Sequence, residues 1–252
     1  MSYYDLDKKE RALFAENIYQ ELVNAVRDFN LDPILPWFNN DDTYTRKAAY
    51  LAAGKSYKNH PELRTSLLSL LYQQTTATEY QLRQTIVNAA GEIGKVDFEA
   101  VASLFDQSLF DKHHSVRNAV IGSIKKMAEV NPVPVLSWAS GYLNHSNPEI
   151  RREICHGIEL RGRKHPADIL PMLQQLEFDG SKRVRSTLVH VLGQIAYKKG
   201  CLEVVIRNLN SWNNKPLVAD AAKEIVSVHH RYQPFAFLKP QDAAAYITAH
   251  LK

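Results

Sequence analysis

Apolar residues recur along this chain at the spacing of an amphipathic α-helix, and one helical motif returns at a nearly fixed interval. The clearest copy is KRVRSTLVHVLGQIA (182–196), in which Val184, Leu188 and Leu192 fall on one helical face. The arginines that open five such copies are Arg46, Arg83, Arg117, Arg151 and Arg185. Their spacings of 37, 34, 34 and 34 residues predict a protein built from stacked repeats, each of which buries its apolar face only against its neighbours.

The predicted repeat has two helices joined by a polar segment. The second helix begins with the arginine motif, and the first begins near a capping residue or a proline. Those starts are Asp32-Pro33, His60-Pro61, Asp97, Asn131-Pro132 and His165-Pro166. Proline suits the first turn of a helix, because its missing N–H would have no intrahelical partner there. The last four starts are again 37, 34 and 34 residues apart, so two independent features share one period.

The second helices are expected to pack through a shared apolar seam. Counted from the arginine, positions +3 and +7 are apolar in all five copies, position −1 is apolar from the second copy onward, and the three positions lie on one helical face. One further step of 34 residues from Arg185 reaches Val218-Ala219, so in the sixth copy Ala219 replaces the arginine and Val226 joins the seam. Glycine recurs at position +8, as Gly54, Gly91 and Gly193. Because glycine destabilises a helix interior, this recurrence predicts close approach of neighbouring helices.

These patterns predict an all-α fold, a right-handed α-solenoid of about six helix-pair repeats. We expect one domain over residues 1–252. Residues 1–30 hold an amphipathic capping helix (5–29) that Asp5 or Asp7 can cap, residues 31–228 hold the repeats, and residues 229–252 form a C-terminal cap with a helix at 241–251. No alternating β-branched run bounded by hairpin turns predicts a strand.

Composition and the N-terminal segment set limits on where the chain acts. No apolar run approaches the roughly 18–20 residues that a membrane-spanning helix needs. The segment MSYYDLDKKERALF carries acids where a signal peptide carries a basic region and an apolar core. We therefore expect a cytoplasmic protein that does not bind membranes. Cys155 and Cys201 lie in apolar helical patterns, so we expect buried reduced thiols rather than a disulfide.

Charge is distributed unevenly along the chain. Residues 1–110 contain 11 Lys and Arg against 15 Asp and Glu, whereas residues 111–252 contain 20 against 12. A basic excess of this kind suits a polyanion such as nucleic acid. A lysine-rich solvated surface would give the same composition, so both interpretations stay open.

The repeated motif and its downstream glycine resemble those of HEAT or HEAT-like repeats over about residues 31–228. A 34-residue period would also suit tetratricopeptide repeats, but their Trp-Leu-Gly-Tyr and Ala-Phe-Pro signatures are absent. The resemblance implies an extended surface for binding a macromolecule. Arg151-Arg152 and the segment 184–212 also look like the repeats of bacterial alkylpurine DNA glycosylases. That resemblance implies a basic concave face that holds DNA, an inward carboxylate and aromatic side chains near a damaged base.

The polar stripe opposite the seam offers the candidate binding residues. If the second helices line a concave surface, as in most α-solenoids, His156 and His190 face the partner from equivalent positions of adjacent repeats. The predicted partner-binding or phosphate-binding residues are Arg152, His156, Arg163, Lys182, Arg183, His190, Tyr197 and Lys198. Tyr197 is the exposed aromatic candidate among them, whereas Trp212 is expected in the core.

Other candidates have a structural interpretation beside the functional one. The arginine series can bridge repeats through acids and carbonyls, or contact phosphates. Glu159 is a weak catalytic candidate as a general base, and it can instead pair with Arg152 or Arg163. A metal site is not expected, because neighbouring helices lie about 8–10 Å apart and no ligand cluster stands out in the sequence.

We therefore expect a non-enzymatic scaffold that binds a protein or duplex DNA on its basic surface and uses no cofactor. The alternative is a DNA-binding relative of the alkylpurine DNA glycosylases that contacts phosphates through the basic cluster of residues 151–199.

Overall fold

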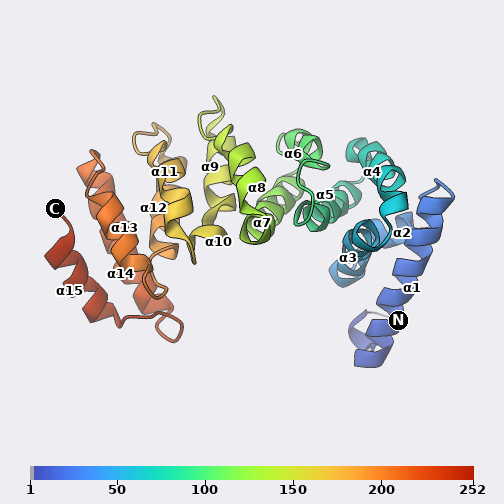
Figure 1. Ribbon diagram of the computed structural model, residues 1–252, viewed down its shortest axis with the longest axis horizontal. Coiled ribbons are helices and arrows are strands. Elements are labelled where there is room, and N and C mark those ends of the chain that lie inside the picture. The colour runs from blue at the N-terminus through green and yellow to red at the C-terminus, as the bar shows by residue number, and fades with distance from the viewer. Residues whose placement is uncertain (1–2) are drawn as a thin grey trace. The chain divides into compact units, whose positions relative to one another are not determined.

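The computed structural model describes residues 3–252, and within this range every regular element is a helix (Figure 1). The predicted all-α solenoid fold is confirmed. The helices group into two compact units, the first ending at Pro134 and the second comprising Val135–Lys252.

The first unit stacks long helices in chain order. Its α-helices are α1 (Lys8–Arg27), α2 (Leu35–Phe38), α3 (Thr43–Asn59), α4 (Arg64–Gln73), α5 (Tyr80–Gly94), α6 (Ala102–Ser108) and α7 (His114–Val130). Short 3-10 helices lie at Tyr3–Asp5, Pro61–Leu63 and Gln74–Thr76. Helix α3 packs between α1 and α5, and α5 packs between α3 and α7 (Figure 1). The second helices of the repeats thus form one continuous layer.

The second unit repeats this arrangement, and the boundary between the units falls within α8. Its helices are α8 (Pro132–Ser140), α9 (Pro148–Gly157), α10 (Glu159–Gly162), α11 (Pro166–Gln174), α12 (Lys182–Gln194), α13 (Cys201–Leu209), α14 (Lys215–Arg231) and α15 (Pro240–His250). Helix α12 packs between α9 and α14, while α13 packs against α11 and α15 (Figure 1).

The arginine motif sets where each second helix begins. Helices α3, α5, α7, α9 and α12 all start three residues before their arginine. Side-chain caps hold several of these starts: Asp42 accepts from the N–H of Tyr44, and Asn147 accepts from the N–H of Glu149. The capping helix α1 starts at a capping box, in which Asp7 accepts from Glu10 N and the Glu10 carboxylate accepts from Asp7 N.

The apolar seam is buried as predicted in the first five copies but is offset by one residue in the sixth. Helix α14 starts at Lys215, so Val218 and not Ala219 stands three residues from its start. Ile225 is consequently buried, while the predicted seam residue Val226 is only partly buried. The prediction for Val226 and Ala219 is wrong because the connection before α14 is one residue shorter than a strict 34-residue period requires.

Glycine at position +8 allows the second helices to approach closely. A Cβ on Gly91 in α5 would collide with the side chain of Ser123 in α7. Gly54 faces Glu92, and Gly193 faces Glu224 in the same manner. The predicted close approach is confirmed at all three positions. Any larger residue would force the helices apart.

The C-terminal segment covers apolar surface of the last repeats. Tyr232 stacks on Tyr197 with ring centroids 5.5 Å apart, and Phe237 N donates to Tyr197 O at 2.9 Å. Trp212 is buried as predicted, and its indole N–H donates to Asn208 at 2.9 Å. The thiols of Cys155 and Cys201 are free and buried. None of the helices formed by residues 3–252 is long and apolar enough to cross a lipid bilayer.

Candidate functional site

Two of the five motif arginines bridge adjacent repeats through a carboxylate. Arg83 Nε and Nη2 donate to the two oxygens of Asp111 at 2.7 and 2.9 Å. Arg151 binds Asp179 in the same bidentate manner, at 2.6 and 2.9 Å. In each pair the acid stands 28 residues after the arginine. These two arginines are therefore committed to holding repeats together.

Four of the motif arginines also donate hydrogen bonds through Nη1 to backbone carbonyl oxygens in the segment just before their own helix. Arg83 Nη1 donates to Ala77 O and Thr78 O, and Arg117 Nη1 donates to Asp111 O at 2.7 Å. Arg46 contacts the carbonyls of Asn40 and Asp41. Four of the five motif arginines therefore have the structural role expected from the sequence, which is binding of carbonyls and acids of the protein itself.

Arg185 is the exception in the series. Its side chain is exposed and forms no hydrogen bond or ion pair with any residue in the range 3–252, although its charge helps to lower the pKa of Asp179. The residue 28 positions later is Asn213, so the bridging carboxylate is missing. Arg185 instead lines a groove together with Lys182.

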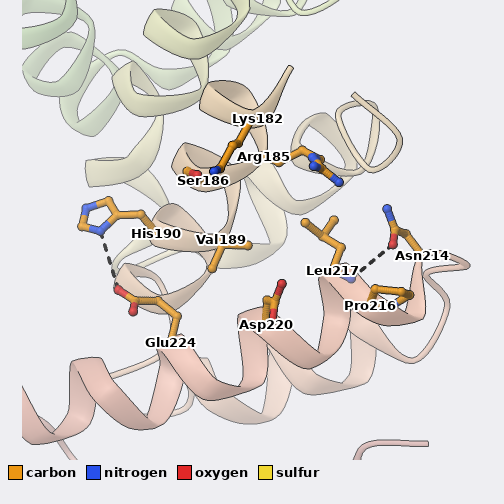
Figure 2. A pocket seen from close by; sticks show the side chains of 10 residues that line it. All are labelled: Lys182, Arg185, Ser186, Val189, His190, Asn214, Pro216, Leu217, Asp220 and Glu224. Atoms are coloured by element: carbon orange, nitrogen blue, oxygen red, sulfur yellow. Dashed lines mark hydrogen bonds and ion pairs between the residues drawn. The ribbon is translucent and has the colours of Figure 1, made fainter. Parts of the chain in front are cut away.

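This groove lies between α12 and α14 and has a volume of about 450 Å³. Figure 2 shows Asp220 and Glu224 pointing from α14 toward α12, which contributes Lys182 and His190. Its lining residues are Lys182, Arg185, Ser186, Val189, His190, Asn214, Pro216, Leu217, Asp220 and Glu224. Val189 and Leu217 supply apolar surface, and Asn214 caps α14 by accepting from Leu217 N.

The two ends of the groove carry opposite charges. Lys182 and Arg185 lie in the first turn of α12, and Arg185 extends toward Asn214 (Figure 2). Toward the other end, Glu224 accepts from Arg231 and lies 3.7 Å from His190 Nδ1. Asp220 is exposed and lies 3.5 Å from Lys223 Nζ, a separation at which an exposed pair contributes little. The groove thus offers two cations that are unpaired among residues 3–252 at one end, and toward the other end two carboxylates whose charge Arg231 and Lys223 partly offset.

Most of the predicted basic cluster is neutralised by neighbouring acids. Arg152 binds Glu149 at 2.6 and 2.9 Å, and the exposed Arg183 reaches the other Glu149 oxygen at 3.0 Å. Arg163 binds Glu159 at 2.5 and 3.0 Å. The surface built from residues 149–183 is therefore of mixed charge, and a strongly basic patch does not form here.

Two of the predicted partner-binding residues, Tyr197 and Lys198, contact the C-terminal segment instead of facing a partner. Tyr197 is 5% exposed and lies under Tyr232, so the prediction of an exposed aromatic platform is wrong. Lys198 lies over the Tyr197 ring and within 3.4 Å of Phe235 O. The segment 232–237 covers Tyr197 through the stacked Tyr232 ring and through the hydrogen bond from Phe237 N to Tyr197 O.

His156, Glu159 and His190 do come together. Their nitrogen and carboxylate donor atoms all lie within 4.8 Å of one another, and the rings of His156 and His190 meet edge to face at 6.1 Å. The expectation that adjacent repeats hold these groups too far apart is wrong, because it used the separation of helix axes and ignored the inward reach of the side chains. Glu159 stands at position +8, where three of the other copies have glycine, and it is 1% exposed.

Ion pairs set the electrostatics of this cluster. The Glu159 carboxylate accepts from Arg163 through Oε1 and faces His156 Nε2 through Oε2 at 3.2 Å. Burial lowers the pKa of His190, and the attraction of Glu159 and Glu224 does not fully offset that effect. The neutral form of His190 is therefore favoured relative to a solvent-exposed histidine, and its Nδ1 faces Glu224 at 3.7 Å.

Sequence reasoning missed the α14 side of the groove. Asp220, Glu224 and Leu217 were not singled out, because the strict 34-residue count displaced α14 by one residue and its motif lacks the arginine. The available signal was the glycine at position +8 of α12. Gly193 packs against Glu224 and Val228, so it indicated which part of α14 approaches α12.

Comparison with known proteins identifies the fold. No family model and no curated protein sequence matches the chain. AlkD2 from Streptococcus mutans has a TM-score of 0.56 at 18% sequence identity, covering 82% of this chain and 98% of that one. The protein smu.31 from Streptococcus mutans UA159 has a TM-score of 0.53 at 19% identity, with the same coverage. The chain therefore shares the HEAT-like helical-repeat fold of these two proteins.

Proposed function

We propose that this chain is a non-enzymatic, cytoplasmic binding protein that holds a segment of another protein in the groove between α12 and α14. The observation that carries the proposal is the opposite charge of the two groove ends, with Lys182 and Arg185 at one and Asp220 and Glu224 at the other. A peptide can complement both signs, since its side chains vary along its length.

A polyanion fits this groove less well. Duplex DNA carries one negative charge about every 1.7 Å of its axis, so it favours a surface of uniform positive charge. Asp220 and Glu224 line the same groove and would weaken its attraction for phosphates, although Arg231 partly offsets the charge of Glu224. Arg152 and Arg163 would also have to leave Glu149 and Glu159 before they could bind a phosphate.

The length of the groove limits the peptide that can use both ends. Lys182 and His190 are eight residues apart on α12, which corresponds to about 12 Å at the rise of an α-helix. An extended peptide advances about 3.3 Å per residue, so about four residues span that distance. We expect the bound segment to carry an acidic residue and a basic residue separated by about three or four positions, with apolar side chains between them for Val189 and Leu217.

Selection from a displayed library of random peptides tests this proposal. The wild-type protein should enrich peptides with the acid-to-base spacing described above. The double variant Lys182→Glu/Arg185→Glu reverses the charge of one groove end, so it should lose those peptides and enrich peptides with two basic positions. Fluorescence anisotropy of individual enriched peptides then gives the loss of affinity, which we expect to be at least ten-fold.

The matched control for this selection is Arg207→Glu. Arg207 is an exposed arginine on α13 and does not line the groove. This variant should enrich the same peptides as the wild type. Enrichment that is equal in the wild type and the groove variant would overturn the proposal, as would the absence of any enriched charge pattern.

A second candidate function is binding of duplex DNA through its phosphates. The observation in its favour is that Lys182 and Arg185 form no ion pair among residues 3–252, and that the neighbouring Arg183 side chain is 73% exposed. The sequence resemblance to alkylpurine DNA glycosylases points in the same direction. This function predicts retarded duplex migration that weakens steeply with added salt and in Lys182→Ala/Arg183→Ala/Arg185→Ala. Release of an alkylated base that is lost in Glu159→Gln would add an excision activity to it.

A further inference from the structure

We propose that His156, Glu159 and His190 form a binding site for a divalent transition-metal ion of the Zn²⁺ class. The donor atoms of these three residues lie within 4.8 Å of one another in the second unit. The site shares His190 with the groove wall but does not depend on the function proposed for the groove.

The donor set suits zinc. Two imidazoles and one carboxylate are a common ligand set for a Zn²⁺ ion that keeps a fourth position open. Imidazole nitrogens favour zinc, copper, iron and nickel over magnesium and calcium, which bind mainly oxygen ligands. A site of these three residues should therefore discriminate strongly against Mg²⁺.

One ligand pair already has the required spacing. Donors bound to one tetrahedral zinc at about 2.1 Å lie about 3.4 Å apart, and His156 Nε2 lies 3.2 Å from Glu159 Oε2. The longest separation in the cluster must shorten by about 1.4 Å to reach the same value. The His190 side chain is 44% exposed, so a change of rotamer can supply this movement without disturbing the core.

The groups around the three ligands would orient them toward a metal. Arg163 binds Glu159 Oε1, which fixes the buried carboxylate and directs Oε2 toward His156. Glu224 lies on the Nδ1 side of His190, which leaves Nε2 as the metal-binding nitrogen (Figure 2). Carboxylates commonly support a metal-binding histidine in this way. His156 would bind the metal through Nε2, the nitrogen that faces Glu159 Oε2.

The same surroundings also limit the affinity. Arg163 places a positive charge against the carboxylate that would bind the metal, so we expect micromolar rather than nanomolar binding of Zn²⁺. His190 belongs to both the cluster and the groove wall. Metal binding would therefore fix the orientation of one wall residue.

Titration of the full-length, tag-free protein with Co²⁺ and Zn²⁺ tests the site directly. Co²⁺ should give the visible absorption of four-coordinate cobalt with a stoichiometry of one, and Zn²⁺ should displace it. Either His156→Gln or His190→Gln should lower the affinity for Co²⁺ at least ten-fold while leaving the circular dichroism spectrum unchanged. Mg²⁺ should not displace the bound Co²⁺.

The control is His230→Gln, which removes an exposed histidine of α14 that is outside the cluster. This variant should bind Co²⁺ like the wild type. The proposal fails if the wild type shows no saturable Co²⁺ absorption, or if His190→Gln binds Co²⁺ with unchanged affinity. Because no partner is present, failure of this titration leaves the groove proposal untouched.

Discussion

Arg151 and Asp179 form two parallel hydrogen bonds, from Nε to Oδ2 at 2.6 Å and from Nη2 to Oδ1 at 2.9 Å. Arg151 lies in the first turn of the second helix of one repeat, and Asp179 lies just before the second helix of the next, so the pair links consecutive repeats. The same arrangement recurs between Arg83 and Asp111 in the first unit. The motif arginines, which recur most regularly along the chain, therefore serve mainly to hold neighbouring repeats together.

Substitution of Asp179 should destabilise the second unit. The hydrogen bonds from Arg151 lower the pKa of Asp179, and they outweigh the opposing effect of burial. Asp179→Asn leaves Arg151 without its carboxylate, and we expect the free energy of unfolding at pH 7 to fall by about 3 kcal/mol. Urea denaturation followed by circular dichroism measures the change.

The effect of Asp179 should depend on pH. A carboxylate whose pKa is lowered in the folded state contributes stability above its unfolded pKa of about 3.9, and the contribution disappears as the pH falls through the folded value. Wild type and Asp179→Asn should therefore converge in strongly acidic solution. The control Asp220→Asn removes an exposed carboxylate with a weak lysine contact and should change stability by less than about 0.5 kcal/mol.

Two arginines of the same motif should behave differently when truncated. Arg83→Ala removes a buried side chain and leaves Asp111 without its bidentate partner, so we expect a loss of about 3–5 kcal/mol in the free energy of unfolding. Arg185→Ala removes an exposed side chain and should cost no more than about 0.5 kcal/mol. Equal losses in thermal or urea unfolding would contradict the assignment of Arg185 to the groove.

Substitution by alanine should change the stability of the protein in opposite directions at two helical glycines, Gly91 and Gly122. Gly91→Ala drives a methyl group into Ser123 across the α5–α7 contact, so we expect destabilisation by about 1–3 kcal/mol. Gly122→Ala meets no other described atom within 4 Å and should stabilise α7 by about 0.5–1 kcal/mol. Differential scanning calorimetry should show a lower Tm for the first variant and a higher Tm for the second.

The aromatic stack at the C-terminal segment should contribute to stability. Tyr232→Ala removes the ring that covers Tyr197, and we expect a loss of about 1–2 kcal/mol together with greater solvent exposure of the segment. Hydrogen exchange at Phe237, whose N–H donates to Tyr197 O, should accelerate. Phe235→Ala is the matched control, because its side chain is 68% exposed and should have little effect.

The sequence predicted the fold well because periodic burial and helix starts are local properties. Val184, Leu188 and Leu192 are all buried, and helices begin at Pro132 and Pro166 as expected. The sixth repeat was misplaced by one residue, since a period found in five copies cannot reveal a shorter connection in the next. Tyr197 was misjudged because its exposure depends on residues 232–237, which lie outside the repeat.

The candidate site was predicted only in part. Lys182 and His190 were identified from their own helix, but Asp220 and Glu224 on the other side of the groove were not. The predicted basic cluster carries less net positive charge than expected, because Arg152 and Arg163 pair with Glu149 and Glu159. Net charge along the sequence does not show which charges neutralise each other in space.

Photo-crosslinking at Ser186 in living cells tests the central claim most directly, because Ser186 is exposed and lines the groove. A benzophenone side chain at this position should form a protein adduct that protease removes and nuclease does not, and that Lys182→Glu/Arg185→Glu abolishes. The same group at Arg207 on α13 should not form that adduct. A nuclease-sensitive adduct at Ser186, or a protein adduct that is equally abundant from Arg207, would contradict the claim that the α12–α14 groove binds a protein partner.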